Sequence, residues 1–317
     1  MTWIRICLDR EIQRTTKMEK TLLVLGGPTA IGKTSCGIQL ASHFNTQVLS
    51  ADSRQIYRET TIGTAVPSAV ELRLIKHHFI QSTSLENPYN ASRYEQDALL
   101  ALEELFKDHD ILLMVGGSGL YIDAVCTGID DLPSADPQLR NRLLERFKEE
   151  GLEPLTRQLK ELDPHSYEKV DLKNHMRVLK ALEVSLQTGR PYSEFLSNTR
   201  KERPFRILRA ALDMDREDLY NRINRRVDLM MDEGLLEEVK SVIPYRHLTA
   251  MKTVGYRELF RYLDAEISLE EAVDLIKRNT RKFARKQLTW FRKGQKYTWF
   301  HPEQAAEIAS WVADQQD

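Results

Sequence analysis

The sequence predicts an α/β fold: a parallel β-sheet core interrupted by an all-helical insertion and followed by a helical C-terminal part. Three observations support this class. Short apolar runs alternate with helical stretches up to residue 134, strand-like sequence is nearly absent from 135–203, and helical stretches dominate again after one more apolar run. Strands that alternate with helices are typical of right-handed βαβ units, in which neighbouring strands are parallel.

The first strand is predicted at the apolar run 21–25, which ends in two glycines and has the unbroken hydrophobicity of a strand buried on both faces. Weaker runs of the same kind follow, and the stretches between them have helical character. Further strands are predicted at 47–50 and 111–115, with helices at 33–44 and 92–107.

The insertion is predicted to begin after Pro133, where the strand signal ends. Ser134 or Asp136 can cap a helix that has Pro137 at its first position and ends near Gly151. Three short helices are predicted to follow at 153–162, 174–187 and 191–196.

The sheet is predicted to resume with the apolar run 205–214, after which nearly every segment is helical. The C-terminal helices are predicted at 216–231, 235–242, 256–263 and 268–293. We therefore expect a tail at 1–17, a core formed by 18–134 and 204–317, and an insertion domain at 135–203.

The composition is that of a folded cytoplasmic protein. With 41% hydrophobic and 29% charged residues the chain can bury a core, which excludes wholesale disorder. No membrane span is expected, and residues 1–17 lack the apolar centre of a secretory signal. Three cysteines (Cys7, Cys36 and Cys126) form neither a disulfide framework nor a zinc pattern, which suits a reducing compartment. The pair His77 and His78 lacks further metal ligands and is interpreted as structural.

Residues 27–34 match the pattern G-x-x-x-x-G-K-[ST] of a phosphate-binding loop, after a predicted strand and at a helix start. The loop consists of Gly27, Pro28, Thr29, Ala30, Ile31, Gly32, Lys33 and Thr34. The two glycines let successive N–H groups turn toward phosphate oxygens, and the helix N-terminus adds partial positive charge. Lys33 supplies a mobile cation, and Thr34 offers a hydroxyl to Mg²⁺. We therefore expect a core like that of the P-loop NTPases and a phosphorylated ligand.

The identity of that ligand is a separate question. NTPases carry an aspartate near the end of a later strand to hold Mg²⁺. Here the run 111–115 leads directly into Gly116, and the nearest upstream acid, Asp110, lies at the opposite end of the strand. This absence weakens a kinase or ATPase interpretation and leaves room for a pyrophosphate other than ATP.

Two polar side chains follow other predicted strands. Asp52 comes after the second strand, and Ser118 lies in the glycine-rich loop after the third. Ligands of open α/β sheets bind beyond the carboxyl ends of the strands, so both should lie near the phosphate loop. From position alone, Asp52 can be a helix cap, a metal ligand or a general base, and Ser118 can be a turn residue or a ligand contact.

The total charge of −1, from 46 basic and 47 acidic residues, averages unlike regions. Nine basic residues and no acidic one lie between 277 and 296, so this helix is expected to contact an RNA backbone rather than to be only a solvated face. For the aromatic residues nearby, core packing is favoured over base stacking. These are Trp290, Phe291, Tyr297, Trp299 and Phe300.

The motifs together resemble those of the bacterial-type tRNA dimethylallyltransferases, over nearly the whole chain. They are GPTAIGKT at 27–34, DSRQIY at 52–57, IGTAVPS at 62–68, VGGSGLY at 115–121, LPSADP at 132–137, RVLKALEV at 177–184 and VGYRE at 254–258. The resemblance implies transfer of a dimethylallyl group from dimethylallyl diphosphate to N6 of adenosine 37 in tRNA. It also implies a nucleoside-kinase-like core and an insertion that binds the anticodon stem-loop. A diphosphate ligand would explain the missing carboxylate.

The resemblance also assigns roles to residues. It implies that Asp52 is the base, that Ser118 contacts the reacting nucleotide, and that Arg222, with Arg226 as a second candidate, binds the leaving diphosphate. Mg²⁺ would be held by Thr34 through the diphosphate. The implied tRNA contacts are Asp52, Ser53, Arg54, Gln55, Ser118, Arg140, Met176, Arg177, Val178, Leu179, Lys180, Lys252, Thr253, Val254, Gly255, Tyr256 and Arg257.

Some positions depart from the family pattern. Leu179 stands where some relatives have a polar residue, so Arg177 and Lys180 are stronger candidates than their neighbours. Eukaryotic relatives often carry a zinc module near the C-terminus, but no cysteine follows Cys126, and no zinc is expected.

Several functions compete on this basis. The favoured one is a monomeric tRNA dimethylallyltransferase. A P-loop small-molecule or nucleoside kinase is opposed by the basic helix, the insertion and the missing carboxylate. A non-catalytic RNA-binding protein is opposed by the intact Lys33, Thr34 and Asp52. An adenylate isopentenyltransferase shares the phosphate loop but needs neither the insertion nor the basic helix.

Overall fold

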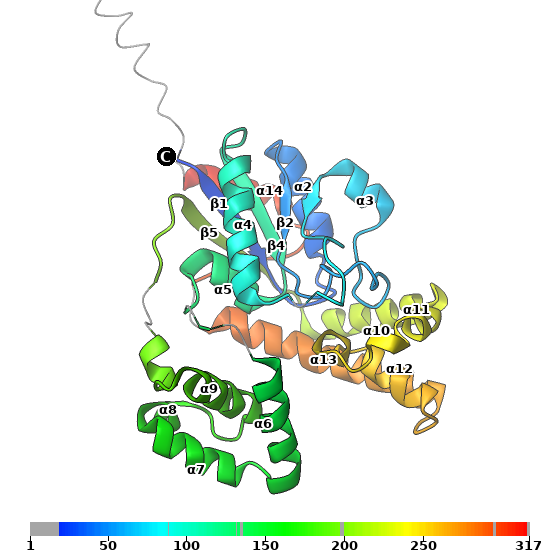
Figure 1. The fold of residues 1–317 in the computed structure, drawn as a ribbon. Coiled ribbons are helices and arrows are strands. Elements are labelled where there is room, and N and C mark those ends of the chain that lie inside the picture. The colour runs from blue at the N-terminus through cyan, green and yellow to red at the C-terminus, as the bar shows by residue number, and fades with distance from the viewer. Residues whose placement is uncertain are drawn as a thin grey trace, which may run out of the picture. The chain divides into compact units, whose positions relative to one another are not determined.

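The computed structural model describes residues 19–315 except 88, 131, 134–135, 197–199 and 294–295, so the predicted tail lies outside the described residues. The chain divides into two compact units (Figure 1). One unit, the core, contains the chain up to Thr127 and from Glu202 onward, and the other, the insertion unit, contains Gly128–Lys201.

The core is built on a parallel sheet of six strands in the order β3-β2-β4-β1-β5-β6. The strands are β1 (Thr21–Gly26), β2 (Val48–Ser50), β3 (His77–His78), β4 (Ile111–Gly116), β5 (Arg206–Leu212) and β6 (Thr298–Phe300). The predicted α/β class is confirmed, and each of the four predicted strands is present. The sequence did not predict β3 and β6, which are only two and three residues long.

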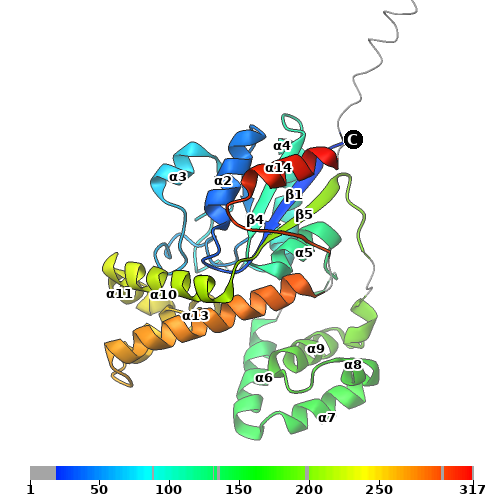
Figure 2. The same cartoon turned by 180° about the vertical axis from the view of Figure 1, so that it is seen from behind.

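Strand β1 lies between β4 and β5, and all six of its residues are buried. Successive side chains of a strand point to opposite faces. Accordingly, Leu22 and Val24 belong to one apolar layer, and Leu23 and Leu25 belong to the other. Helices therefore cover both faces of the sheet, with α4 and α5 in front in Figure 1 and with α2 and α14 in front in Figure 2.

The helices of the core supply these layers and a third apolar cluster. They are α2 (Lys33–His43), α3 (Ala69–Leu74), α4 (Ala91–Leu105), α5 (Gly119–Thr127), α10 (Arg216–Asp232), α11 (Leu235–Ser241), α12 (Tyr256–Leu263), α13 (Leu269–Arg292) and α14 (Ala305–Asp314), with 3₁₀ turns η2 (Ile243–Tyr245) and η3 (Thr249–Lys252). The third cluster joins α10 to α13 beyond the carboxyl ends of the strands. Helices α10 and α13 run side by side in both views (Figures 1 and 2).

The insertion unit is all-helical and has an apolar core of its own. Its elements are α6 (Pro137–Glu150), α7 (Glu153–Leu162), α8 (Pro164–Lys169), α9 (His175–Thr188) and the 3₁₀ turn η1 (Tyr192–Phe195). Asp136 caps α6, because its Oδ1 accepts a hydrogen bond from the N–H of Gln138 at 2.8 Å, and Pro137 is the first helical residue. Ser134, the other candidate cap, lies outside the described residues.

Both boundaries differ from the predicted 135–203: the insertion unit is Gly128–Lys201, and Arg203 belongs to the core. Its Nη2 donates to Oε1 of Glu95 at 2.7 Å and to the carbonyl of Ala124 at 2.9 Å, and its Nε donates to the carbonyl of Val125 at 2.7 Å. Both side chains of the ion pair are less than a tenth exposed. This buried pair fastens the returning chain beside the end of α5.

Candidate functional site

The phosphate loop connects β1 to the first turn of α2, as its sequence predicts. Gly27 and Gly32 have φ angles of 147° and 108°, which favour glycine. A Cβ on Gly27 would lie 3.2 Å from the carbonyl oxygen of Leu212. A cavity of about 600 Å³, hereafter the phosphate cavity, is lined by the loop residues Thr29, Ala30, Gly32, Lys33 and Thr34.

Three cations surround this loop. Nζ of Lys33 donates to the carbonyl of Pro28 at 2.6 Å, and Nε of Arg222 donates to the carbonyl of Ala30 at 3.0 Å. Nη1 of Arg226 lies 3.5 Å from Oγ1 of Thr29. Lys33 and Arg222 thus donate to loop carbonyls and Arg226 to a loop hydroxyl, and all three side chains line the phosphate cavity.

The electrostatics of Lys33 are unusual for a lysine. Burial lowers the pKa of its ammonium to about 7, the nearby Asp52 opposes this shift, and Arg226 adds to it. Burial also lowers the pKa of Arg226, with Arg222 adding and Asp52 opposing. The side chains of Lys33, Arg222 and Arg226 are thus held close together where water solvates them poorly. An anionic ligand bound among them would stabilise their charged forms.

Asp52 follows β2 and is fixed through one carboxylate oxygen. Its Oδ1 accepts hydrogen bonds from the backbone N–H of Arg54 at 2.9 Å and of Gln55 at 3.4 Å. Among the described residues, no hydrogen-bond donor reaches Oδ2. One oxygen therefore orients the side chain as a cap does, and the other remains available for a proton.

Ser118, after β4, links that loop to the segment after β2. Its Oγ accepts from the N–H of Ser53 at 3.0 Å and lies 3.2 Å from Oγ of Ser53. The two strands meet closely here, because a Cβ on Gly116 would lie 2.1 Å from the carbonyl oxygen of Ala51. Asp52 and Ser118 are thus brought together, as their strand-end positions predict.

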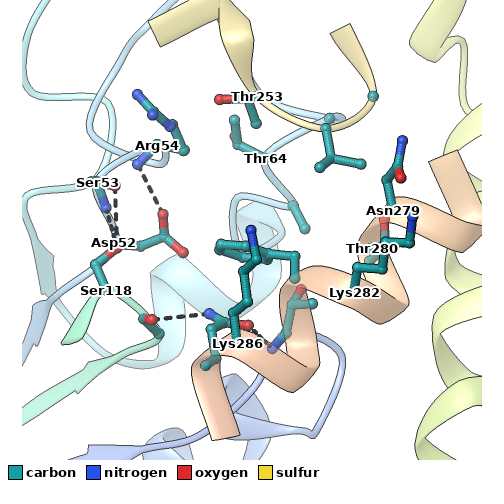
Figure 3. Close-up of a pocket in the computed structure, with 18 of the residues that line it drawn as sticks. Asp52, Ser53, Arg54, Thr64, Ser118, Thr253, Asn279, Thr280, Lys282 and Lys286 are labelled. Atoms are coloured by element: carbon teal, nitrogen blue, oxygen red, sulfur yellow. Dashed lines mark hydrogen bonds between the residues drawn. The ribbon is translucent and has the colours of Figure 1, made fainter. Parts of the chain in front are cut away.

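A second, larger cavity of about 1190 Å³ adjoins the phosphate cavity. Figure 3 shows it with Asp52 and Ser118 on one side and α13, carrying Lys282 and Lys286, on the other. The residues that line both cavities are Thr29, Asp52, Thr64, Arg226, Phe283 and Gln287. Asp52 therefore stands where the two cavities meet.

The lining of the larger cavity is strongly basic. Asp52 is the one carboxylate among the described residues that line it. The cations of the lining are Arg54, Arg226, Lys252, Arg257, Lys282, Arg285 and Lys286. Such a lining suits a polyanion that places an uncharged group beside Asp52.

Comparison with known proteins identifies the family. Residues 55–294 match the sequence profile of the IPP transferases. The chain belongs to the IPP transferase family. It is 50% identical to tRNA dimethylallyltransferase 1 of Bacteroides thetaiotaomicron, over 92% of this chain and 95% of that protein. It is 49% identical to tRNA dimethylallyltransferase 1 of Phocaeicola vulgatus, over 93% of this chain and 98% of that protein.

Solved structures agree. The full-length tRNA isopentenylpyrophosphate transferase of Bacillus halodurans superposes with a TM-score of 0.69 at 34% identity, covering 94% of this chain and 97% of that one. A eukaryotic dimethylallyltransferase acting on tRNA superposes with a TM-score of 0.71 at 27% identity, covering 86% of this chain and 70% of that one.

The basic helix of this IPP transferase is α13, and its cations divide into two groups. Lys282, Arg285 and Lys286 line the larger cavity. By contrast, Lys277 pairs with Asp228 at 2.6 Å, and Arg292 pairs with an aspartate after β5. Because of such pairs, the whole run is not a uniformly free basic surface, and its middle faces the cavity.

The aromatic residues of this region also divide. Phe291 is 1% exposed, and Tyr297, Trp299 and Phe300 pack against the cores, as expected. Trp290 differs from the expectation, because it is 44% exposed and lines the larger cavity.

In the segment 252–257, the predicted tRNA contacts whose charged side chains are exposed are Lys252 and Arg257. Lys252 and Arg257 are exposed, and together with Thr253, Val254 and Gly255 they line the larger cavity.

One predicted tRNA contact of this segment has a different role. The Tyr256 side chain is fully buried, and its hydroxyl donates to Oε1 of Glu238 at 2.6 Å. The Tyr256 ring packs directly against Gly63, in the space that a Cβ at that position would occupy, and this packing keeps the side chain from the surface. We therefore withdraw the Tyr256 side chain from the predicted contacts.

In the insertion unit, the α9 segment has an exposed and a buried side. Met176 and Arg177 are exposed, whereas Val178 and Leu179 are 0% and 1% exposed and belong to the core of this unit. The side chains of Val178 and Leu179 are therefore withdrawn from the predicted tRNA contacts, because the amphipathic helix turns them inward.

Arg140 and Lys180 share a partner. Nη1 of Arg140 lies 2.5 Å from Oε2 of Glu183, and Nζ of Lys180 lies 3.5 Å from Oε1 of the same carboxylate. Glu183 is fully buried, whereas the two cations are about a third exposed. The buried carboxylate thus holds both cations in place.

Sequence reasoning missed Gln287 and Phe283, which line both cavities. A signal was available, because positions 283, 287 and 290 recur at helical spacing and so share one face of α13 with the lysines at 282 and 286.

Metal ligands are scarce in the parts of the chain that the structure describes, where no group of three or more His, Cys, Asp and Glu could hold a metal ion. His77 and His78 form β3, and burial lowers the pKa of both imidazoles. Cys36 and Cys126 are free and buried.

Within the described ranges, no helix is long and apolar enough to cross a membrane.

Proposed function

We propose that this IPP transferase transfers the dimethylallyl group of dimethylallyl diphosphate to N6 of adenosine 37 in tRNA and releases diphosphate. The position of Asp52 carries the proposal. This side chain stands where a phosphate-binding cavity meets a larger, basic one, with one oxygen fixed by backbone N–H groups. A carboxylate so placed can reach a group that approaches from either cavity.

The phosphate cavity binds the diphosphate. The turned backbone of the loop and the N-terminus of α2 present N–H groups to it. Lys33, Arg222 and Arg226 exchange their loop partners for diphosphate oxygens and offset the negative charge that develops on the leaving group.

Mg²⁺ fits this donor set. Thr34 lines the phosphate cavity, and its hydroxyl and the diphosphate oxygens are hard ligands of the kind that Mg²⁺ accepts while it keeps several waters. When bound, the ion supplies further positive charge to the departing diphosphate.

The larger cavity receives the RNA. The adenine must leave the anticodon-loop stack to reach Asp52, as base-modifying enzymes require. Cations from α13 and from the segments at 54 and 252–257 then bind the phosphates on both sides of the adenine. The exposed Arg177 and the carboxylate-held Arg140 and Lys180 extend the contact to the anticodon stem-loop. The acting species is a monomer.

In the transfer, the lone pair of N6 forms a bond to C1 of the dimethylallyl group. The C1–O bond breaks, and its electron pair leaves with the diphosphate. Oδ2 of Asp52 takes the proton that N6 loses. Ser118 positions the nucleotide beside the carboxylate.

The deciding experiment uses the full chain, Mg²⁺ and radiolabelled dimethylallyl diphosphate with one of three acceptors: an anticodon stem-loop RNA that carries A37, the same RNA with G37, or free AMP. A parallel assay replaces the dimethylallyl diphosphate with γ-labelled ATP. We expect label in the A37 RNA only. Label in free AMP but not in RNA would instead indicate an adenylate isopentenyltransferase. Phosphate transfer from ATP without prenyl transfer would indicate a kinase.

The role of Asp52 has its own test. Asp52→Asn keeps the shape and the acceptor for the Arg54 N–H but removes the base. We expect the transfer rate to fall by about 100-fold or more, the lower range for loss of a general base, with diphosphate affinity within about threefold of the wild type. A variant with a normal rate at saturating substrate would refute the assignment.

A further inference from the structure

Gln287 of α13 connects two loops that the sequence places far apart. Its Oε1 accepts a hydrogen bond from the backbone N–H of Thr29 at 2.8 Å, and its Nε2 donates to the carbonyl of Gly117 at 2.9 Å. The first partner lies in the phosphate loop after β1, and the second lies in the loop after β4. Gln287 is only 8% exposed; its hydrogen bond to Gly117 is buried, and the one from Thr29 is partly buried.

The fit around this amide is close. A Cβ on Gly117 would lie 2.3 Å from Nε2 of Gln287, so only glycine leaves room for the bridge. Gln287 also lines both cavities. It therefore stands beside the junction at which the two substrates would meet.

The bridge extends to Asp52 through one more link. Ser118, next to Gly117, accepts from the N–H of Ser53, which follows Asp52. The loops after β1, β4 and β2 are thus joined in series, first by Gln287 and then by Ser118. These hydrogen bonds of Gln287 and Ser118 set the distance between the phosphate loop, which would hold the leaving group, and Asp52, which would take the proton.

We propose that Gln287 is a positioning residue, which fixes the phosphate loop against the loop of Ser118 and thereby aligns the diphosphate with Asp52. This inference rests on the proposed function. It assigns Gln287 no bond to be made or broken. Misplacement of reacting groups by about 1 Å can cost about 100-fold in rate, so loss of the bridge should lower the rate at saturation more than it lowers binding.

Two variants separate hydrogen bonding from packing. Gln287→Met roughly keeps the volume but removes both hydrogen bonds, and its side chain fills the space between the Thr29 N–H and the Gly117 carbonyl. Gln287→Ala opens a space between the Thr29 N–H and the Gly117 carbonyl, in which a water can restore the bridge. The control is Gln39→Met, at an exposed position of α2 whose amide, among the described residues, bonds to Ser35 alone.

The readouts are the kcat and KM of dimethylallyl transfer to the A37 RNA, inorganic diphosphate affinity by calorimetry, RNA affinity by filter binding, and Tm. We expect Gln287→Met to lower kcat at least tenfold, with both affinities within about threefold of the wild type. Gln287→Ala should be less impaired than Gln287→Met, although it removes more side chain, and Gln39→Met should be normal.

A residue that served only packing would give the reverse order, with Gln287→Met near the wild type and Gln287→Ala worst. That order would overturn the proposal, as would a loss of rate fully explained by weaker binding or unfolding. If Gln287→Met does not fold, Gln287→Leu takes its place: a kcat below that of Gln287→Ala with intact binding supports the proposal, and a kcat equal to or above that of Gln287→Ala overturns it. A wild-type protein that transfers nothing to RNA would instead refute the proposed function.

Discussion

The lowered pKa of Lys33 leads to a measurable proton uptake when diphosphate binds. In the ligand-free protein burial lowers this pKa to about 7. A pKa of about 7 leaves about 0.9 of the lysine neutral at pH 8 and about 0.1 neutral at pH 6. Diphosphate in the loop favours the charged form, so binding should restore the ammonium. Lys33 should therefore take up about 0.9 proton at pH 8 and about 0.1 at pH 6.

The sign for stability follows from the same pKa. The folded protein binds fewer protons at Lys33 than the unfolded chain between pH of about 7 and 10.5, so this group makes the free energy of unfolding rise with pH across that window. Below about pH 7 both states are charged, and the contribution is constant. Bound diphosphate should remove the slope.

The assay is isothermal titration calorimetry with inorganic diphosphate and Mg²⁺, in two buffers of different ionisation enthalpy at each pH. The ligand itself titrates, so Lys33→Arg serves as the control, because arginine stays charged throughout. The wild type minus the control should show the uptake at pH 8 and almost none at pH 6. Equal proton uptake by the two proteins at pH 8 would show that Lys33 is already charged in the free protein and would refute the reasoning.

Two further predictions concern the framework of the site. Gly116→Ala should lower the free energy of unfolding by about 4 kcal/mol or more, because its Cβ would overlap the Ala51 carbonyl. Gly189→Asn should lower it by less than about 1 kcal/mol, because Gly189 has open space around it and a φ of 69°, which asparagine tolerates. Urea denaturation of the two variants compares these losses. Equal stability of the two variants would contradict this. Arg203→Ala should cost about 3–5 kcal/mol, since it removes a buried cation that bonds to Glu95 and to the carbonyls of Ala124 and Val125. Thermal unfolding checks it, and a loss below about 1 kcal/mol would mean that the pair behaves as an exposed one.

Local patterns in the sequence sufficed for the central part of the fold. The run 21–25 and the glycines after it encode a buried strand and a phosphate loop within a few residues, and no distant contact is needed to recognise them. Asp52 and Ser118 could be placed together because the carboxyl ends of parallel strands share one edge of a sheet. The family resemblance then supplied the reaction and the substrate.

The residues that were misjudged depend on what surrounds them. Val178 and Leu179 fall within a motif attributed to RNA binding, but the period of α9 turns them into the core. Tyr256 is hidden by its contacts with Gly63 and Glu238, and neither is adjacent in sequence. The role of Gln287 requires knowing that it meets a backbone N–H 258 positions away.

The fastening of Arg203 to the end of α5 has a consequence for how the insertion could have arisen. The chain leaves the core after Thr127 and returns at Glu202, and the arginine holds the two crossing points together by bonding to the carbonyls of Ala124 and Val125. Because both ends of the insertion are held together at the core, its entropic cost can be treated as that of closing a loop. Doubling the length of a flexible loop costs only about 0.6 kcal/mol. The core can therefore accept segments of different lengths at this point at little cost in loop closure, and the sheet need not change with them.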